Sequence, residues 1–252
     1  MIQLKSPREI EVMAEGGRIL ANTVELLRGR ARAGMTTLDL DTLAEAFIRS
    51  HEGATPAFKG LYGFPGSVCT SINHEIVHGI PSKKRVLQDG DLVSIDIGVR
   101  YRGFYTDSAT TVAIGEVDET SQRLLDVTQR ALAAGIAAAT LGNHIGDIGA
   151  AVQEVVEREG FSVVRDLVGH GIGTDFHEEP EVPNYGKPKR LMKLAPGLTI
   201  AIEPMVNVGS PRTRTLPDRW TIVTVDGSRS AHFEHTVAIT ENGPRVLTRA
   251  TA

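Results

Sequence analysis

Cysteine is almost absent from this chain of 252 residues. The single cysteine, Cys69, excludes an internal disulfide framework and fits a reducing compartment. No segment approaches the roughly 18 consecutive apolar residues of a membrane span, and charge enters the N-terminus before any apolar signal core can form. The net charge of −4 is too small to indicate a polyanion-binding surface. We therefore expect a soluble cytoplasmic protein with no membrane contact and no direct readout of nucleic acid.

Helices and strands are predicted in the same order in the two halves of the chain. Ser6, Pro7 and Glu9 supply the N-cap, the first residue and the capping box of a helix that ends near residue 30. Amphipathic periodicity predicts three more helices, after residue 36, over 120–139 and over 148–159. Apolar runs predict strands at 68–72, 92–99, 104–114, 198–208, 220–225 and 231–240.

Two sequence motifs recur at an almost constant offset. Gly34-x-Thr36-x-x-Asp39 returns as Gly142-x-His144-x-x-Asp147, and Gly90-x5-Asp96 returns as Gly197-x5-Glu203. A repeat this long and this diverged indicates a duplicated α-β half rather than a solenoid. If the halves pack about a pseudo-twofold axis, Asp96 and Glu203 converge near that axis. We expect a single domain over residues 1–252, with its halves at about 5–115 and 116–247.

Two acidic residues interrupt the apolar strands of one predicted β-hairpin. The hairpin turns near Tyr101 and Arg102, which places Asp96 and Asp107 nearly opposite each other. Two carboxylates on neighbouring strands repel, and burying either charge unpaired is costly. A divalent cation between them removes the conflict, because hard cations take oxygen ligands. The alternative is that both acids lie at strand ends and face water.

Three further residues with ligand chemistry lie in apolar or glycine-rich surroundings. Glu203 interrupts an apolar run, Glu234 shares one face of a strand with His232 and Thr236, and His170 lies in a glycine-rich loop. Taken singly, Glu234 could be a surface acid and His170 a turn histidine. Together with the hairpin acids they are too anionic to share a pocket without more than one divalent cation. This donor set suits Mn, Fe(II) or Co better than a thiolate-rich structural zinc site.

Seven short motifs occur in order along the chain. They are His78-Gly79-Ile80-Pro81, Asp96-Ile97-Gly98, Thr106-Asp107, Gly169-His170-Gly171-Ile172-Gly173, His177-Glu178-Glu179-Pro180, Ile202-Glu203-Pro204 and Phe233-Glu234-His235-Thr236. The ordered set resembles the methionine aminopeptidase family from about residue 5 to residue 247. The resemblance implies an α+β pita-bread fold, with two pseudo-symmetric halves around a central antiparallel sheet. The short stretch from His177 to Glu203 and the lack of a Cys-x-x-Cys extension look like the bacterial type I form.

The resemblance also implies a ligand set and an activity. Two divalent ions, of Co, Mn, Fe(II) or Zn, would be held by Asp96, Asp107, His170, Glu203 and Glu234. Asp107 and Glu234 would bridge the ions, and Glu203 would also move a proton. His78 and His177 match the family's substrate-contacting histidines. The implied reaction is hydrolysis that removes the N-terminal methionine of nascent polypeptides when the second residue is small.

The same resemblance implies an apolar slot for the first side chain of the substrate. The residues that match this slot are Phe58, Leu61, Phe64, Cys69, Phe176 and Trp220. Phe58, Leu61 and Phe64 stand where relatives often have Cys or Tyr. We therefore expect the rim of the pocket to lack a tyrosine hydroxyl.

Two other functions use the same fold. A proline-specific aminopeptidase or prolidase would share the five ligands, but such relatives usually carry a large additional N-terminal domain. A non-catalytic binding module would have lost ligands, and here all five are present. We expect a monomer that acts on nascent polypeptide N-termini. Two basic loops, 83–85 and 187–190, leave a transient contact with the ribosome open, although solvated turns are the simpler interpretation.

Overall fold

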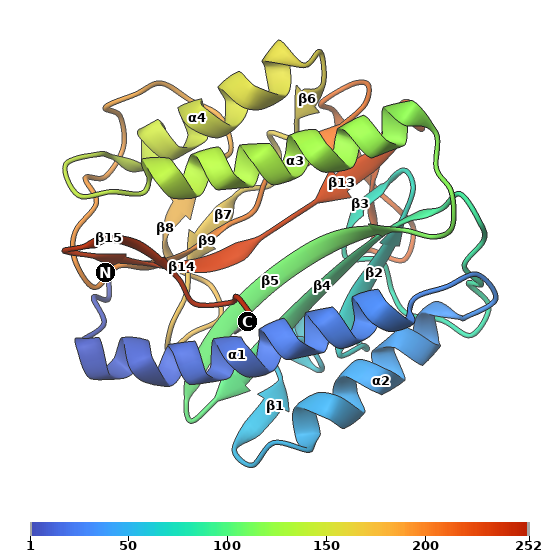
Figure 1. The fold of residues 1–252 in the computed structure, drawn as a ribbon, viewed down its shortest axis with the longest axis horizontal. Coiled ribbons are helices and arrows are strands. Elements are labelled where there is room, and N and C mark those ends of the chain that lie inside the picture. The colour runs from blue at the N-terminus through green and yellow to red at the C-terminus, as the bar shows by residue number, and fades with distance from the viewer. Residues whose placement is uncertain (1, 251–252) are drawn as a thin grey trace.

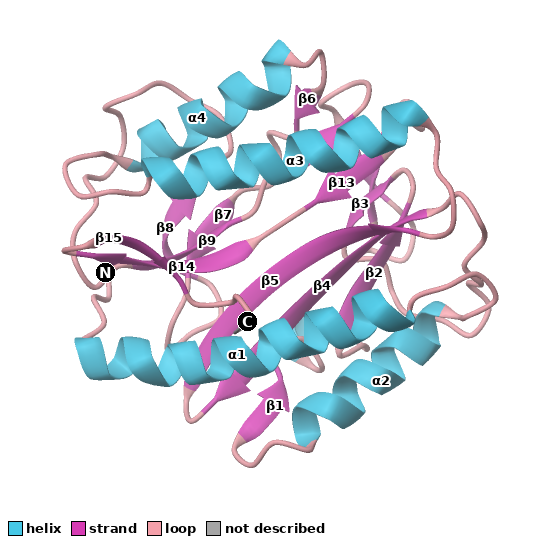
Figure 2. Cartoon of the chain, in the orientation of Figure 1, coloured by secondary structure: helices cyan, strands magenta, loops and turns pink. Residues whose placement is uncertain are grey.

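The computed structural model describes residues 2–250, which contain four α-helices and many strands (Figure 1, Figure 2). The helices are α1 Pro7–Arg30, α2 Thr37–Arg49, α3 Glu119–Ala138 and α4 Ile145–Arg158, with a 3-10 turn, η1, at Leu61–Gly63. The strands of the first half are β1 Ala54–Pro56, β2 Val68–Ile72, β3 Glu75–Val77, β4 Leu92–Tyr101 and β5 Phe104–Ala113. Those of the second half are β6 Ser162–Val163, β7 Gly169–Gly171, β8 Glu178–Val182, β9 Thr199–Ile202, β10 Met205–Asn207, β11 Thr213–Thr215, β12 Ile222–Thr224, β13 Ser230–His232, β14 His235–Thr240 and β15 Gly243–Val246.

The sheets are antiparallel and connect the two halves of the chain. Strand β4 pairs with β1, β2 and β5, while the longest sheet of the second half has the order β15-β14-β9-β7-β8. Strand β3 of the first half pairs with β12 of the second. Figure 1 shows α1 and α2 along the lower side of the strands and α3 and α4 along the upper side. The predicted α+β class, with helices outside and antiparallel strands between them, is confirmed.

The recurring motifs form corresponding local structures at the starts of α2 and α4. Asp39 accepts a hydrogen bond from the backbone N–H of Thr36 at 2.7 Å, and Asp147 accepts one from the N–H of His144 at 2.7 Å. Both cap residues also form isolated β-bridges, Thr36 with Val86 and His144 with Lys193. The expected capping box of α1 is present as well. The assignment of one domain with two related halves is consistent with these contacts and stays a prediction.

The hairpin of β4 and β5 turns one residue later than expected. Tyr101 pairs with Phe104, and both turn residues have positive φ, 46° for Arg102 and 92° for Gly103. Positive φ at both central positions gives the turn whose twist matches the flanking strands. Asp107 therefore pairs with Gly98 rather than lying opposite Asp96. The two acids still share a face, because residues two apart on a strand point the same way.

Two further expectations about strands were wrong in detail. The glycine-rich segment around His170 is strand β7, not a loop. Gly169 and Gly171 make this possible, because a Cβ on either would overlap the backbone carbonyls of the neighbouring strands, at Ala201 and Glu179. The predicted strand 231–240 is interrupted between β13 and β14, at Phe233 and Glu234. Within residues 2–250 no helix has the length and apolar character required to span a bilayer.

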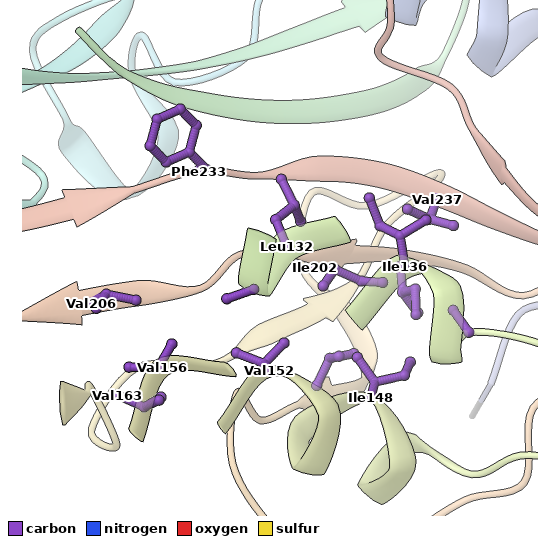
Figure 3. Packing of buried hydrophobic residues seen from close by; sticks show 14 of the residues in the cluster. Leu132, Ile136, Ile148, Val152, Val156, Val163, Ile202, Val206, Phe233 and Val237 are labelled. Carbon is purple, nitrogen blue, oxygen red and sulfur yellow. The ribbon is translucent and has the colours of Figure 1, made fainter. Parts of the chain in front are cut away.

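The larger apolar core lies between α3, α4 and the strands of the second half. Figure 3 shows Leu132 and Ile136 of α3 and Ile148 and Val152 of α4 directed toward Ile202 and Val237, among others. Ile148, Val152, Ile202 and Val237 have no exposed surface. Because Ile202 directly precedes Glu203, this core fixes the end of β9 that carries a candidate ligand.

Replacing Ile148 by Ala should lower the free energy of unfolding by about 2–5 kcal/mol, because it removes buried methylenes and leaves a cavity. Urea denaturation of the purified protein measures the change. Leu38→Ala, at a position on α2 that is 39% exposed, is the matched control and should change the free energy by less than about 0.5 kcal/mol. Equal losses in the two variants would contradict this view of the core.

Candidate metal centre

One cavity of about 500 Å³ collects every residue that the sequence singled out for chemistry. Its lining includes the five expected ligands and the two expected substrate histidines. It also includes all of the expected slot residues. The full set is Phe58, Leu61, Phe64, Cys69, His78, Asp96, Asp107, His170, Phe176, His177, Glu203, Trp220 and Glu234. Since these residues come from both halves, the cavity depends on how the halves pack.

Four carboxylates reach the cavity from four different strands or strand ends. Asp96 lies on β4 and Asp107 on β5, Glu203 follows β9, and Glu234 lies between β13 and β14. Asp96, Asp107 and Glu234 are buried, and the Glu203 side chain is 13% exposed. Convergence from separate strands places acids together that are up to 138 residues apart in the chain, between Asp96 and Glu234.

The backbone of β5 and one of its side chains hold the segment that carries Glu234. The Thr236 hydroxyl donates to the Asp107 carbonyl at 2.8 Å and accepts from the Asp107 N–H at 2.8 Å. The Ser108 hydroxyl donates to the Glu234 carbonyl at 2.7 Å, and the Glu234 N–H donates to the Ala109 carbonyl at 3.0 Å. These bonds are inaccessible to water and rigidly relate Asp107 to Glu234.

Burial makes ionisation of the four acids unfavourable in the absence of a cation. It raises the pKa of Asp96 to about 7. Burial also raises the pKa of Asp107 well above its ordinary value, and repulsion from Asp96 and Glu203 adds to the shift. The pKa values of Glu203 and Glu234 are raised for the same two reasons. A compensating positive charge is therefore needed for all four to be ionised near neutral pH.

His170 is oriented so that one nitrogen is free for a cation. Its Nδ1 lies 2.8 Å from the Gly171 carbonyl, which can only accept, so Nδ1 carries the proton and Nε2 keeps its lone pair. Nε2 lies 3.8 Å from Glu203 Oε1 and 4.0 Å from Asp107 Oδ2. Burial and repulsion from His177 lower the pKa of His170 to about 4, so the imidazole is neutral near pH 7. Such an orienting bond is typical of metal-binding histidines.

The donor set fits a divalent cation. One ligand atom each from Asp107, His170 and Glu234 lies within 4.8 Å of the others. Among residues 2–250, Asp96 Oδ1 and Glu234 Oε1 are buried and have no hydrogen-bond partner, a condition that a bound cation would relieve. Oxygen-rich ligands with one imidazole match Mn, Fe(II) or Co chemistry, as well as a catalytic zinc site. The residues present can therefore hold metal.

The two expected substrate histidines stand at the side of the acid cluster. His78 follows β3 with a φ of 60°, and His177 directly precedes β8. Burial lowers the pKa of His177, and burial together with repulsion from His177 lowers that of His78 to about 4. The ring centroids of His170 and His177 are 4.3 Å apart. Both expected substrate histidines are thus neutral donors or acceptors beside the acids.

An ion pair fixes the turn that carries His177. Lys5 pairs with Glu178, and both side chains are buried. Glu178 Oε1 also accepts from the backbone N–H groups of Thr174, at 2.7 Å, and Asp175, at 3.2 Å. The segment before α1 therefore helps position the loop beside the cavity.

Aromatic side chains line the apolar part of the cavity. Phe58 packs edge-on against Phe64 and Phe176, and Phe64 packs edge-on against Trp220 at a centroid distance of 5.1 Å. Cys69 pairs with Asp96 across β2 and β4 and is buried. Burial raises the pKa of its thiol well above the ordinary value, and repulsion from Asp96 adds to the shift. The thiol is therefore a protonated, apolar wall of the slot.

The expectation that the pocket rim lacks a tyrosine hydroxyl was wrong. Tyr62 lines the cavity, and its hydroxyl lies 3.3 Å from His177 Nδ1. Its ring stacks on the His177 ring at a centroid distance of 5.8 Å. The turn η1 explains the difference, because Tyr62 adopts a φ of 50° between Gly60 and Gly63 and so projects over the mouth.

Several other cavity residues were not among the expected site residues, and Met205 and His232 are two of them. Met205 and His232 face each other across β10 and β13 and line the floor. His232 is two residues before Glu234, and the alternation of a strand was a usable signal for its proximity. Met205, one residue after Ile202-Glu203-Pro204, offered no chemical signal.

The sequence model described as metallopeptidase family M24 matches residues 11–241. The fold and the buried acid cluster agree with that class of metal-dependent peptidase.

Individual relatives narrow the class. The chain is 52% identical to the methionine aminopeptidase of Clostridium perfringens, over 98% of this chain and 99% of that protein. It is 51% identical to methionine aminopeptidase 1 of Bacillus subtilis, over 99% of this chain and all of that protein. The crystal structure of methionine aminopeptidase from Thermotoga maritima superimposes with a TM-score of 0.97 at 45% identity, covering 99% and 100% of the two chains. The chain therefore belongs to metallopeptidase family M24 and, within it, to the methionine aminopeptidases.

The same fold also occurs in a prolidase whose sequence is much less similar. The prolidase of Pyrococcus horikoshii matches with a TM-score of 0.78 at 22% identity, and this chain covers 64% of it. The pita-bread fold inferred from the sequence motifs is confirmed by these matches.

Replacing Asp96 by Asn should change the pH dependence of stability in the metal-free protein. Because burial raises the pKa of Asp96 to about 7, the folded chain keeps a proton that the unfolded chain releases above about pH 4. The wild type should therefore lose stability relative to the variant as pH rises from about 4 to about 7.

Urea denaturation of both metal-free proteins across this pH range measures the effect. The buried histidines have lowered pKa values and the opposite pH dependence, but they are common to both proteins and cancel in the difference. Parallel pH curves for the two proteins would show that Asp96 is not a buried acid of this kind.

Proposed function

We propose that this protein removes the N-terminal methionine from nascent polypeptides when the second residue is small. The observation that carries the proposal is the buried cluster of four acids and one imidazole on the floor of a cavity with an aromatic slot. The acids supply a metal-binding floor and the slot supplies a place for one unbranched apolar side chain. A metal-bound α-amine of the substrate would limit cleavage to the first peptide bond.

Two divalent ions per chain would be held by Asp96, Asp107, His170, Glu203 and Glu234. Asp96 would serve one ion, His170 and Glu203 the other, and Asp107 and Glu234 would serve both. Co, Mn, Fe(II) and Zn are all compatible with this donor set. When bound, such ions lower the pKa of a water molecule and make hydroxide available near neutral pH.

The remaining steps belong to side chains of this chain. Glu203 would take up a proton from the attacking water and deliver it to the leaving amine. His177 donates to the oxygen of the scissile carbonyl as negative charge develops there. His78 hydrogen-bonds to the substrate amide and so orients the peptide bond.

The aromatic slot selects the first side chain. Methionine is unbranched and makes favourable sulfur contacts with aromatic rings, which Phe58, Phe64, Phe176 and Trp220 provide. Leu61 and Cys69 complete the apolar wall. A charged side chain would find no partner in the slot. The next subsite is narrow, because His78 and His177 close on the scissile amide.

The cellular setting follows from this substrate. The protein acts in the cytoplasm on nascent polypeptide N-termini, as a monomer with one domain over residues 1–252. Transient ribosome contact through the basic loops at 83–85 and 187–190 would place it near its substrates.

Substitution of His170 and of His177 separates metal binding from substrate activation. His170→Ala should lose bound metal and activity together, because it removes a ligand. His177→Ala should keep its metal and lose kcat by roughly 10²–10³-fold, the range for loss of an oxyanion donor. Metal content and peptidase kinetics after reconstitution measure both effects.

His51→Ala is the control for these substitutions, since His51 lies at the end of α2 and not on the cavity. It should retain both metal and activity. Loss of metal in His177→Ala would reverse the division between ligand and substrate histidines.

Four tripeptides test the specificity. We expect kcat/KM to be highest for Met-Ala-Ser, low for Met-Leu-Ser because of the narrow second subsite, and low for Leu-Ala-Ser. An apolar pocket separates close isosteres by only about 1–3 kcal/mol, so norleucine should still be accepted. All substrates are compared under one metal condition, with a chelated sample as the blank. Preference for Ala-Pro-Ser over Met-Ala-Ser would instead favour a proline-specific aminopeptidase.

A further inference from the structure

His232 is a buried imidazole on the cavity floor that the proposed reaction leaves without a role. It is 1% exposed and ends strand β13. Its backbone N–H donates to the Thr111 hydroxyl at 2.8 Å, and its carbonyl accepts from the same hydroxyl at 2.9 Å. The backbone is thus fixed to β5, and the ring has little freedom to leave the cavity floor.

Two candidate ligands face the same nitrogen of this ring. Nε2 lies 3.8 Å from Glu203 Oε2 and 3.8 Å from Glu234 Oε2. Among the described residues 2–250, neither His232 ring nitrogen has a hydrogen-bond partner. A buried nitrogen without a partner is costly, so its presence calls for an explanation. Both carboxylate oxygens lie within 4 Å of Nε2 and can accept a proton from it.

The contrast with His170 indicates what kind of role His232 has. A histidine that binds metal normally donates its other N–H to an orienting acceptor, as His170 Nδ1 does to Gly171. His232 Nδ1 has no such acceptor in the described chain. Glu203 is also shared between the two rings, with Oε1 toward His170 Nε2 and Oε2 toward His232 Nε2. This arrangement indicates that His232 donates a hydrogen bond to the ligands Glu203 and Glu234 and is not itself a sixth metal ligand.

We propose that His232 is a positioning residue of the metal centre, whose Nε2–H donates to the carboxylate oxygens of Glu203 and Glu234 that face it. Because carboxylates only accept, they select the tautomer with the proton on Nε2. The donor keeps both acids in the orientation that binds cations. This role rests on the proposed metal centre, but it does not depend on which peptide is cleaved.

Two substitutions at His232 test the donor. His232→Leu removes the N–H and should weaken Mn²⁺ binding by about 10–100-fold, the range for loss of an outer partner, while the number of ions bound stays the same. His232→Gln keeps an N–H donor in a side chain of similar reach and should restore most of the affinity. Calorimetric titration of Mn²⁺ into the metal-free protein measures both, without substrate.

His235 provides a matched control three residues further along. It is also a partly buried histidine, but its Nδ1 lies 2.9 Å from the Thr248 hydroxyl and its side chain does not line the cavity. His235→Leu should therefore leave Mn²⁺ affinity within about threefold of wild type, even if it lowers stability by breaking that bond.

Each outcome at His232 has a distinct meaning. Wild-type affinity in His232→Leu would overturn the proposal, and loss of one bound ion in His232→Gln would make His232 a ligand instead. If His232→Leu does not fold, the ¹⁵N chemical shifts of His232 in the Zn²⁺-loaded wild type show which ring nitrogen carries the proton. A proton on Nδ1 rather than Nε2 would overturn the assignment. Metal binding without cleavage of Met-Ala-Ser would refute the proposed function and leave this inference standing.

Discussion

Repulsion among four buried carboxylates is the constraint on which the rest of the structure depends. Asp96, Asp107, Glu203 and Glu234 cannot all be ionised in this surrounding without added positive charge, as their raised pKa values indicate. The fold holds them together by backbone and hydroxyl contacts around the carboxylates, such as those of Thr236 and Ser108, and Asp107 Oδ1 itself accepts from the Ser108 N–H at 2.9 Å. The free energy for this arrangement comes from apolar packing elsewhere, such as the core shown in Figure 3.

Strand β5 connects the packed strands to the acid cluster. It pairs with β4 along ten residue pairs on one side, and Asp107, Ser108 and Thr111 hydrogen-bond to residues 232–236 on the other. Strand β5 therefore joins the two halves of the chain, with Asp96 of β4 on one side of it and Glu234 on the other. A metal site built in this way can be precise without a disulfide or a long loop to brace it.

Much of the site could be predicted because an acidic residue stands out in the sequence of an otherwise apolar strand. An acid such as Asp96 within β4, or Glu203 after β9, breaks the pattern of a buried strand and therefore signals a function. The helix starts were equally readable, since Ser6 with Glu9 and Thr36 with Asp39 are local capping signals. Their structure depends on a few neighbouring residues only.

Contacts that depend on tertiary geometry were not readable in the same way. The register of the β4–β5 hairpin depends on which two residues adopt positive φ. The sequence was also compatible with a turn one residue earlier. Tyr62 reaches the mouth only because η1 gives it a left-handed conformation, which neither motif nor periodicity encodes. His170 lies on a strand because adjacent backbones approach its flanking glycines closely, and that approach is set by residues far away in the chain.

The burial of Cys69 beside Asp96 has a consequence for the durability of the site. Oxidants and thiol reagents attack the thiolate, and here burial and the nearby acids keep the sulfur protonated. The one sulfhydryl of the chain is thus shielded from oxidative loss although it borders the chemistry. Besides the Tyr62 hydroxyl, the ionisable donors of the cavity are therefore carboxylate oxygens and imidazole nitrogens, and its sulfur atoms are one protonated thiol and the Met205 thioether.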